Sequence, residues 1–424
     1  MTGKEKLKAA LAHEEAPILF DCGGMNTTGM HCMVMEKLRD FYGLEKRPVK
    51  IIEPSQLLGH MDSDLAECLG VETELVYGSR TCYGFQGRDN WKEWTTPWGQ
   101  EVLVPEEFIT TSDEKGDVLI YACADTRCAP AGRMPKGGVF FDNEDRAADY
   151  DEDDYDINDN LEEFFLFSDD ELSWFKQQIA GIQDNGHVIT CFGPGTTGGG
   201  TCLADHSMIA GPMLREPKGI RKLQDFYMAT AGDPETIAEI FARETDIGIE
   251  NLKKMHETIG DSIDVLHICG TDLGTQKGLF YSRSTIEELW APYWKKINDW
   301  IHENTLWKTF KHCCGSIAPI IDILIEAGFD TLNPIQWTAE DMDRNMLKEK
   351  YGDRIVFWGG GVDTQHLLPE GTPEQVYAQA QECLKIFSKN GGYVFNTIHN
   401  IVPGVPVENI DALARAVRDF NVGR

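Results

Sequence analysis

The fold is decided by residues 307–336, WKTFKHCCGSIAPIIDILIEAGFDTLNPIQ. This stretch opens with a short apolar run, 307–311, which ends in a polar loop. A helix-like segment follows at 317–327, and a second apolar run lies at 330–332. Strand, polar loop, helix and strand in this order are typical of a parallel βαβ unit. The stretch therefore predicts an α/β protein.

The same order recurs on both sides of that stretch. Apolar runs at 187–192, 263–268, 355–358 and 393–396 each end in a polar or glycine-rich loop. A doubly wound sheet would show the same alternation. A barrel is favoured because chemically reactive residues follow nearly every strand, as expected when all βα loops meet at one face. We expect a distorted (β/α)8 TIM barrel that occupies residues 1–424 as a single domain.

The predicted helix starts carry recognisable caps. Ser284 is followed three residues later by Glu287, which predicts a capping box, and Thr372 precedes Pro373 at another helix start. The glycine-rich loop 193–201, GPGTTGGGT, lacks the Lys-Ser/Thr of a P-loop and the spacing of a dinucleotide fingerprint. We therefore expect no nucleotide-phosphate cradle there.

Two regions depart from the regular pattern. Residues 1–115 show no regular period, and we expect them to form an N-terminal elaboration of the barrel. Residues 142–163, DNEDRAADYDEDDYDINDNLEE, are strongly acidic. No register places glycine at the sixth and glutamate at the twelfth position of an EF-hand loop. The expected structure is a solvated acidic insertion, not a calcium site.

Composition excludes several functional classes. The formal net charge is −31, with 70 acidic against 39 basic side chains, which argues against nucleic-acid binding. No apolar stretch has the length needed to cross a bilayer, and the start, MTGKEKLKAALAHEEAP, resembles a charged amphipathic helix without a signal-peptide core. Twelve scattered cysteines suggest reduced thiols or metal ligands. These features favour a cytoplasmic protein that contacts no membrane.

The strongest chemical signal is the sequence KHCCG at 311–315. Residues two apart in a strand point to the same side, so His312 and Cys314 should converge while Cys313 faces the other layer. An imidazole and a thiolate suit Zn²⁺. A packed thiol beside a hydrogen-bonded core histidine would also explain the pair.

A second pair of the same form, His267 and Cys269, ends an earlier strand. Asp272 follows it, where a carboxylate could bind substrate, a metal or a backbone amide. Further along, His399 follows the last strand, at the mouth of the expected barrel. Asp363 and Asp21 also follow strands, so their carboxylates are expected at the same face.

Several stretches, distributed over nearly the whole chain, carry a family resemblance. They are MTGKEKLKAALAHEEAP (1–17), DLAECLGVE (64–72), APAGRMPKGGVFFD (129–142), CGTDLGTQKG (269–278), KHCCGSIAPIIDILIEAGFDTLNPIQ (311–336), FWGGGVDTQHLLPEGTP (357–373) and FNTIHNIVPGVPVENI (395–410). These stretches resemble the uroporphyrinogen-decarboxylase superfamily. The resemblance implies a distorted TIM barrel, which in this superfamily is often a homodimer.

Within the superfamily, decarboxylases carry an arginine-rich motif near the N-terminus, whereas the corresponding stretch here, FDCGGMNTTGMHC (20–32), has no arginine. The other branch consists of corrinoid-linked methyltransferases that hold zinc through HxC and a later cysteine. The sequence after HCCG matches that branch and selects His312 and Cys314. His399 stands where the third ligand would be, and Cys269 is its rival.

The resemblance implies transfer of a methyl group from a small methylated substrate to the cobalt of a corrinoid on a separate protein. The GTDLGTQ and NTIH loops favour O-demethylation or amine demethylation. We expect Asp272, Asp363 and Asp21 to assist catalysis. For substrate binding we expect Asn396, Gln276 and Trp337, with Trp91, Trp94 and Trp98 as further candidates for an aryl pocket.

Two alternatives to this function stay open at this point. A decarboxylase of another acid would use Asp21 and His399 without a metal. A non-enzymatic binding module would hold no metal and would lack converging Asp, His and Cys side chains in its pocket. Zinc content separates both from the methyltransferase.

Overall fold

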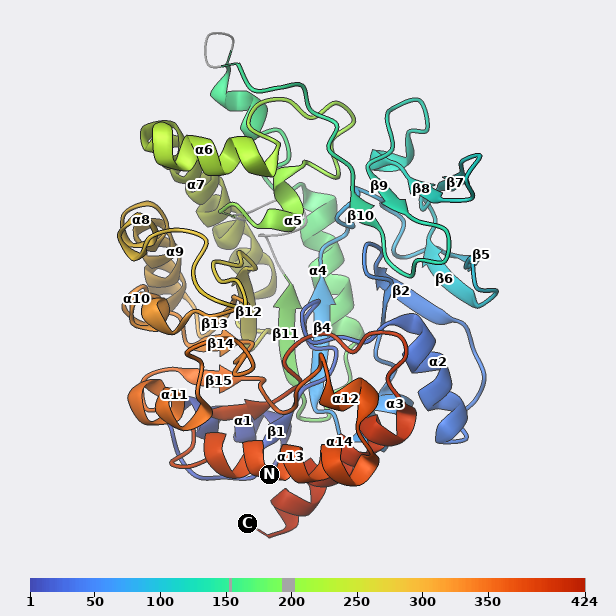
Figure 1. Ribbon diagram of the computed structural model, residues 1–424, viewed down its shortest axis with the longest axis vertical. Helices are drawn as coiled ribbons and strands as arrows, with labels where there is room; N and C mark the ends of the chain where they lie inside the picture. The colour runs from blue at the N-terminus through green and yellow to red at the C-terminus, as the bar shows by residue number, and fades with distance from the viewer. Residues whose placement is uncertain (152–154, 193–202, 424) are drawn as a thin grey trace.

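An eight-stranded parallel sheet forms the centre of the protein in a computed structural model that describes residues 1–151, 155–192 and 203–423. Helices surround this sheet (Figure 1). The order in the sheet is β1-β16-β15-β14-β13-β12-β11-β4. The strands are β1 (Leu19–Phe20), β4 (Thr73–Tyr77), β11 (Val188–Phe192), β12 (Val265–Cys269), β13 (Lys308–His312), β14 (Thr331–Asn333), β15 (Val356–Trp358) and β16 (Tyr393–Phe395). The expected (β/α)8 TIM barrel is confirmed.

The two edge strands, β1 and β4, meet at a narrow seam that nearly closes the barrel. They share no strand ladder, but the Glu72 amide donates to the Phe20 carbonyl at 3.1 Å. The Thr73 hydroxyl also donates to Asp21 at 2.8 Å. The seam is therefore held by isolated hydrogen bonds.

The barrel interior is filled by apolar side chains from most of its strands. They pack as one buried cluster that includes Leu19, Leu75, Val188, Phe192, Val265, Phe310, Val356, Trp358 and Val394. Helix α1 (Gly3–Leu11) adds Leu7 and Ala10 to this cluster and contacts β1, β11 and β16. The interior is thus a packed core, as is usual for this fold.

Helices follow the strands in the order that the sequence predicts. They are α2 (Cys32–Phe41), α3 (Ser63–Leu69), α4 (Asp169–Gly181), α5 (His206–Ile209), α6 (Leu223–Gly232), α7 (Pro234–Ile259), α8 (Arg283–Leu289), α9 (Ala291–Asn304), α10 (Ile321–Glu326), α11 (Arg344–Tyr351), α12 (Leu367–Glu370), α13 (Pro373–Phe387) and α14 (Val407–Val422).

Of the two expected helix caps, one is confirmed and the other is wrong. Thr372 caps α13 in a full capping box with Gln375. At α8 the cap is Ser282, whose hydroxyl accepts from the Thr285 amide, so the expected cap at Ser284 is wrong. Ser284 already lies inside the first turn, because a second serine two residues earlier can make the same bond.

The irregular N-terminal region supplies two strands of the barrel and most of a wall beside it. Residues 1–115 contain β1 and β4 as well as strands of two small sheets beside the barrel (Figure 1). One sheet joins β3 (Leu58–Gly59), β2 (Val49–Glu53), β6 (Glu101–Pro105) and β5 (Trp91–Thr95). The other joins β10 (Asp142–Asn143), β9 (Gly132–Met134), β8 (Val118–Ile120) and β7 (Thr110–Ser112).

The acidic segment 142–163 is less solvated at its end than expected. Asn160 and Glu163 are buried, and Glu163 pairs with the buried Arg221. Asp149, by contrast, is almost fully exposed. The glycine-rich loop 193–201 lies outside the described residues. Across the described ranges, none of the helices combines the length and the apolar character that a bilayer crossing needs.

Candidate metal centre

Strand β13 is regular and directs two donor side chains into the barrel. Phe310 belongs to the interior core, and alternation along the strand then points His312 inward above it. Cys314, two residues on, follows the same direction, and its Sγ lies 3.3 Å from His312 Nε2. Cys313 packs in the layer outside the strands, as the sequence predicts.

His399 completes a three-residue cluster from the loop after β16. Its ring centroid lies 5.3 Å from that of His312, with the two planes nearly perpendicular. One donor atom each from His312, Cys314 and His399 lies within 4.8 Å of the other two. The carboxyl ends of β13 and β16, which β14 and β15 separate in the sheet, thus bring three soft or borderline donors to one point.

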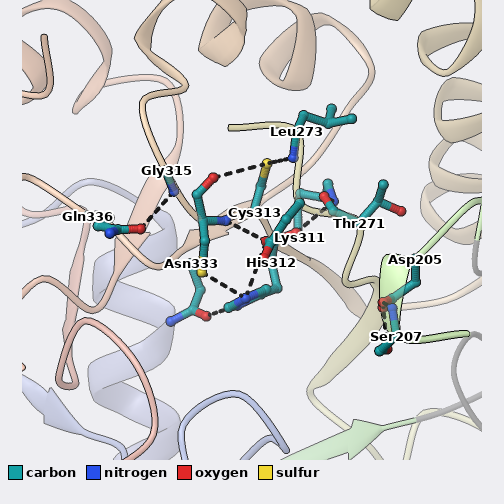
Figure 2. A network of polar contacts seen from close by, with 12 residues as sticks. Asp205, Ser207, Thr271, Leu273, Lys311, His312, Cys313, Gly315, Asn333 and Gln336 are labelled. Atoms are coloured by element: carbon teal, nitrogen blue, oxygen red, sulfur yellow. Dashed lines mark hydrogen bonds and ion pairs between the residues drawn. The ribbon is translucent and has the colours of Figure 1, made fainter. Parts of the chain in front are cut away.

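Asn333 at the end of β14 sets which nitrogen of His312 faces the cluster. His312 Nδ1 lies 2.6 Å from the Asn333 side-chain oxygen, and Figure 2 draws this contact as a dashed line. The Asn333 amide nitrogen donates to the Trp358 carbonyl at 2.8 Å, which fixes the amide orientation. Nδ1 is therefore the protonated nitrogen, and Nε2 presents a lone pair to Cys314. Metal-ligating histidines are commonly oriented by such a partner.

Burial sets the protonation of the cluster. It lowers the pKa of His312, and it lowers that of His399 to about 4 with help from the neighbouring His312. Both rings are thus neutral near pH 7, the form that binds metals. Burial and nearby Asp272 raise the pKa of the Cys314 thiol well above its usual value. A divalent cation would offset that cost by favouring the thiolate.

Asp272 lies at the edge of the cluster. One of its carboxylate oxygens accepts from the Cys314 amide at 2.6 Å and lies 3.6 Å from His312 Nε2. The carboxylate therefore fixes the loop that carries Cys314. Gly315, next in the chain, needs its left-handed φ of +93°, and an added Cβ would lie 2.3 Å from the Gly274 backbone. The two βα loops are packed closely here.

The second His-x-Cys pair does not converge. The β12–β13 register shifts between His267 and Cys269, so two residues of β12 oppose one of β13. This bulge leaves His267 facing the interior while Cys269 packs in the outer layer. There Lys311 Nζ lies 3.5 Å from Cys269 Sγ and donates to the Thr271 carbonyl at 2.8 Å (Figure 2). The structure therefore groups His399, and not Cys269, with the β13 pair.

A cavity of about 350 Å³ opens beside the cluster. His312, His399 and Asp272 line it together with residues of the N-terminal region, of the lateral sheets and of the segment 205–212, which form its walls. The walls include Asn26, Thr27, Glu53, Ser55, Gln56, Cys82, Arg88, Asn143, Phe192, Asp205, His206, Ser207, Met208, Pro212, His267 and Gly270. The donor cluster is therefore accessible to a small molecule.

Two of the three expected catalytic carboxylates lie elsewhere. Asp21 is fully buried at the barrel seam, where it accepts from the Gly24 amide, the Thr73 hydroxyl and the Trp358 indole. Its pKa is raised by burial. Asp363 accepts from the His366 amide and contacts the His366 ring. Both follow strands as expected, but local hydrogen bonds turn them away from the cavity.

The expected substrate-binding residues also lie outside the cavity lining. Asn396 donates to the Asp21 carbonyl, and the Trp337 indole donates to the Gly360 carbonyl under the guanidinium of Arg344. Gln276 is exposed. The three N-terminal tryptophans belong to the lateral region: Trp91 lies beneath Lys50, Trp94 packs on Phe108, and Trp98 packs on His31. None of the six lines the cavity.

Several wall residues escaped the sequence reasoning. Asp205 and His206 follow β11 and its loop, so their position after a strand was an available signal. Glu53 and Arg88 come from the irregular N-terminal region, where no periodic pattern marks a strand end. Arg88 is buried, donates to the carbonyls of Gly78 and Ile52, and stacks on Tyr77. Burial lowers its pKa.

Comparison with known proteins places the cluster in a family context. Residues 210–420 match the family model described as uroporphyrinogen decarboxylase (URO-D). A uroporphyrinogen decarboxylase of Coxiella burnetii is 31% identical over 102 residues, which cover 24% of this chain and 26% of that protein. A methylated-thiol–coenzyme M methyltransferase of Methanosarcina mazei is 26% identical over 117 residues, covering 27% and 28%. The chain thus spans about a quarter of each relative's length.

A solved structure resembles the whole chain. A methyltransferase from Methanosarcina mazei superposes with a TM-score of 0.55 and 17% identity, covering 99% of both chains. At this level of identity the likeness concerns the fold. It extends over the lateral sheets and the barrel alike, so the complete architecture has a counterpart among solved proteins.

Proposed function

Because this chain carries a uroporphyrinogen decarboxylase family domain over residues 210–420, we propose that it is a zinc-assisted methyltransferase of that superfamily. It would move a methyl group from a small methylated ether or amine to the cobalt of a corrinoid on a partner protein. The observation that carries the proposal is the convergence of His312, Cys314 and His399 beside a cavity that two of them, His312 and His399, line.

The donor set fits zinc better than the alternatives. Two neutral imidazoles and a thiol are the ligand types of catalytic zinc sites, which use three protein ligands and keep one position open. Hard cations such as Mg²⁺ and Ca²⁺ prefer oxygen ligands. When bound, zinc supplies Lewis-acid polarisation of a substrate heteroatom or holds a thiolate.

The chain's own residues orient and shield this chemistry. Asn333 keeps the lone pair of His312 Nε2 on the cluster, and Asp272 holds the Cys314 loop through its amide. Residues of the lateral sheets and of the segment 205–212 line the cavity and would limit the contact of a bound substrate with water. Such enclosure strengthens polar interactions between substrate and protein.

A metal-free decarboxylase is the less favoured function. That reaction was expected to use Asp21 together with His399. Asp21 is fully buried, accepts three hydrogen bonds and does not line the cavity with His399. Its carboxylate is therefore unavailable to a substrate in that cavity.

Methyl transfer is tested by mixing the purified protein and zinc with cob(I)alamin, then adding methyl ethers and methylamines one at a time. We expect one class of donor to convert the Co(I) spectrum to that of methyl-Co(III), and Cys314→Ala to abolish the conversion. A corrinoid-binding protein encoded by a neighbouring gene would serve as the natural acceptor. Release of CO₂ from a carboxylic acid without any metal would contradict the proposal.

A further inference from the structure

The cavity wall contains an imidazole whose polar atoms have no partner. Both ring nitrogens of His267 are buried, and neither forms a hydrogen bond with the described residues. No other side chain in the described ranges has two such atoms. His267 lines the same cavity as His312 and His399, so this residue belongs to the cavity of the donor cluster and not to a remote core.

Packing prevents the ring from finding a partner elsewhere. It lies between Phe192 and Phe310, with centroid distances of 4.4 and 5.8 Å and an interplanar angle of 35° to each. The bulge after His267 turns the rest of β12 outward while His267 stays inside the barrel. Bulges beside active sites commonly re-aim side chains in this way. The imidazole is therefore held at the wall by its aromatic neighbours.

An unpaired polar group at such a site is costly without a ligand. Each buried donor or acceptor left unpaired has lost the hydrogen bonds that it made to water in the unfolded chain. Burial lowers the pKa of His267 well below its usual value, so the ring is neutral and offers one N–H donor and one lone pair. Phenylalanine would fill the same space between Phe192 and Phe310 without that cost. The histidine at this position calls for a functional explanation.

We infer that His267 binds the substrate, and that its ring N–H donates to the oxygen of an uncharged methyl ether. This inference rests on the proposed function and names the substrate class for it. Thr27, whose hydroxyl is also buried without a partner, lines the same cavity and can hydrogen-bond a second polar atom of the substrate.

An ether suits the wall better than a methylammonium ion. The oxygen of an ether can accept the hydrogen bond that a neutral imidazole N–H donates, whereas the nitrogen of a methylammonium ion has no lone pair to accept it. Three carboxylates line the cavity together with the guanidinium of Arg88. Each carboxylate already accepts a hydrogen bond from a neighbouring group of the protein: Glu53 from the Ser55 hydroxyl, Asp205 from the Ser207 hydroxyl and Asp272 from the Cys314 amide. The ring of Phe192 offers an apolar surface for the remainder of the ether.

Binding of anisole and of ethylbenzene to the zinc-loaded full chain, measured by calorimetry, tests the inference. The two molecules have similar shape, but only anisole has an oxygen. We expect the wild type to bind anisole at least about tenfold more tightly, in line with the loss of one hydrogen bond. His267→Phe should remove this preference, and His267→Gln should keep part of it.

The same variant separates a binding role from a structural one. His267→Phe should retain its zinc and should melt at or above the temperature of the wild type, because an unpaired polar group is removed. In the wild type, the ring N–H resonance of ¹⁵N-labelled His267 should shift with anisole and not with ethylbenzene. This second measurement does not depend on the folding of any variant.

Three results would overturn the inference: equal binding of anisole and ethylbenzene by the wild type, an unchanged preference in His267→Phe, or tighter binding of tetramethylammonium than of anisole. None of these measurements uses a corrinoid. A failure of methyl transfer alone would therefore contradict the proposed function but not the binding result. Loss of the preference for anisole over ethylbenzene, with methyl transfer intact, would contradict only the assignment of a methyl ether as substrate.

Discussion

Two neighbouring strands end in the same short motif, but its histidine and cysteine side chains point to one side on β13 and to different sides on β12. The motif at the end of β12 runs from His267 to Gly270, and that of β13 from His312 to Gly315. On β13 the histidine and the cysteine both enter the barrel and meet His399. On β12 a bulge separates the pair, so that the histidine faces the cavity and the cysteine faces the helices.

The difference shows that one inserted residue decides whether an alternating pair becomes a site. Strand alternation aligns residues two apart only while the ladder is regular. The regular copy concentrates donors at one point. The interrupted copy divides its donors: Cys269 joins Lys311 in the outer layer, while His267 is left as a lone polar group at the cavity wall.

The largest expected difference between the two motifs is in zinc binding, and it is tested by removing the cysteine of each motif in turn. Cys314→Ala should lower zinc affinity by more than about a thousandfold, because a ligand is lost, whereas Cys269→Ala should keep about one zinc per chain. Metal content after gel filtration, measured by plasma mass spectrometry, gives the answer. Equal retention or equal loss in the two variants would erase the distinction between the motifs.

The glycines that end the two motifs provide the next contrast. Gly315 has a φ of +93° and approaches the Gly274 backbone, so Gly315→Ala should lower the free energy of unfolding by more than about 2 kcal/mol. Gly270 has no left-handed φ, and an added Cβ would meet the side chain of Asp205.

Gly270→Ala should therefore cost less stability than Gly315→Ala, while narrowing the cavity. Urea unfolding of both variants measures the costs. A Gly270→Ala variant that is the less stable of the two would contradict the account of the loops.

The orientation of His312 can be tested through Asn333. Asn333→Leu removes the acceptor for Nδ1–H and should weaken zinc binding about 10- to 100-fold, the usual cost of losing such a partner. Asn333→Asp keeps an acceptor at this position and should lose less zinc affinity than Asn333→Leu. Competition with a chromophoric chelator reports both affinities. Unchanged affinity in the leucine variant would show that Asn333 does not orient the ring.

The smallest expected effect concerns acid stability of the zinc-free protein. The pKa of His267 is lowered in the folded state, so the unfolded chain takes up its proton first as the pH falls below about 6.5. The folded state therefore loses stability in acid. His267→Phe removes that contribution, and its urea midpoint should fall less than that of the wild type between pH 7.5 and pH 5. Identical losses in both proteins would contradict a buried neutral ring.

Sequence reasoning predicted the barrel and its reactive face because both follow from local order. Strand, loop and helix repeat along the chain, and His312, Cys314 and His399 each lie at or shortly after the end of a strand. What it missed depended on contacts between distant segments. The seam that engages Asp21 needs Thr73 and Trp358, and the bulge that turns Cys269 outward appears only against β13.

The lateral wall was hidden for another reason. Its strands are short, and their burial depends on neighbouring loops, so no period marks them. Glu53 and Arg88 reach the cavity from this region, while the three tryptophans that suggested an aryl pocket pack within it. Residue type alone could not separate the residues that line the cavity from those that support it.

X-ray absorption at the zinc edge of the metal-loaded protein tests the central claim most directly. We expect one sulfur scatterer at about 2.3 Å from Cys314, and two imidazole nitrogens at about 2.0 Å from His312 and His399. His399→Ala should remove one imidazole and keep the sulfur. Two sulfur scatterers in the wild type would show that Cys269 or another thiol is a ligand, and would contradict the site described for β13.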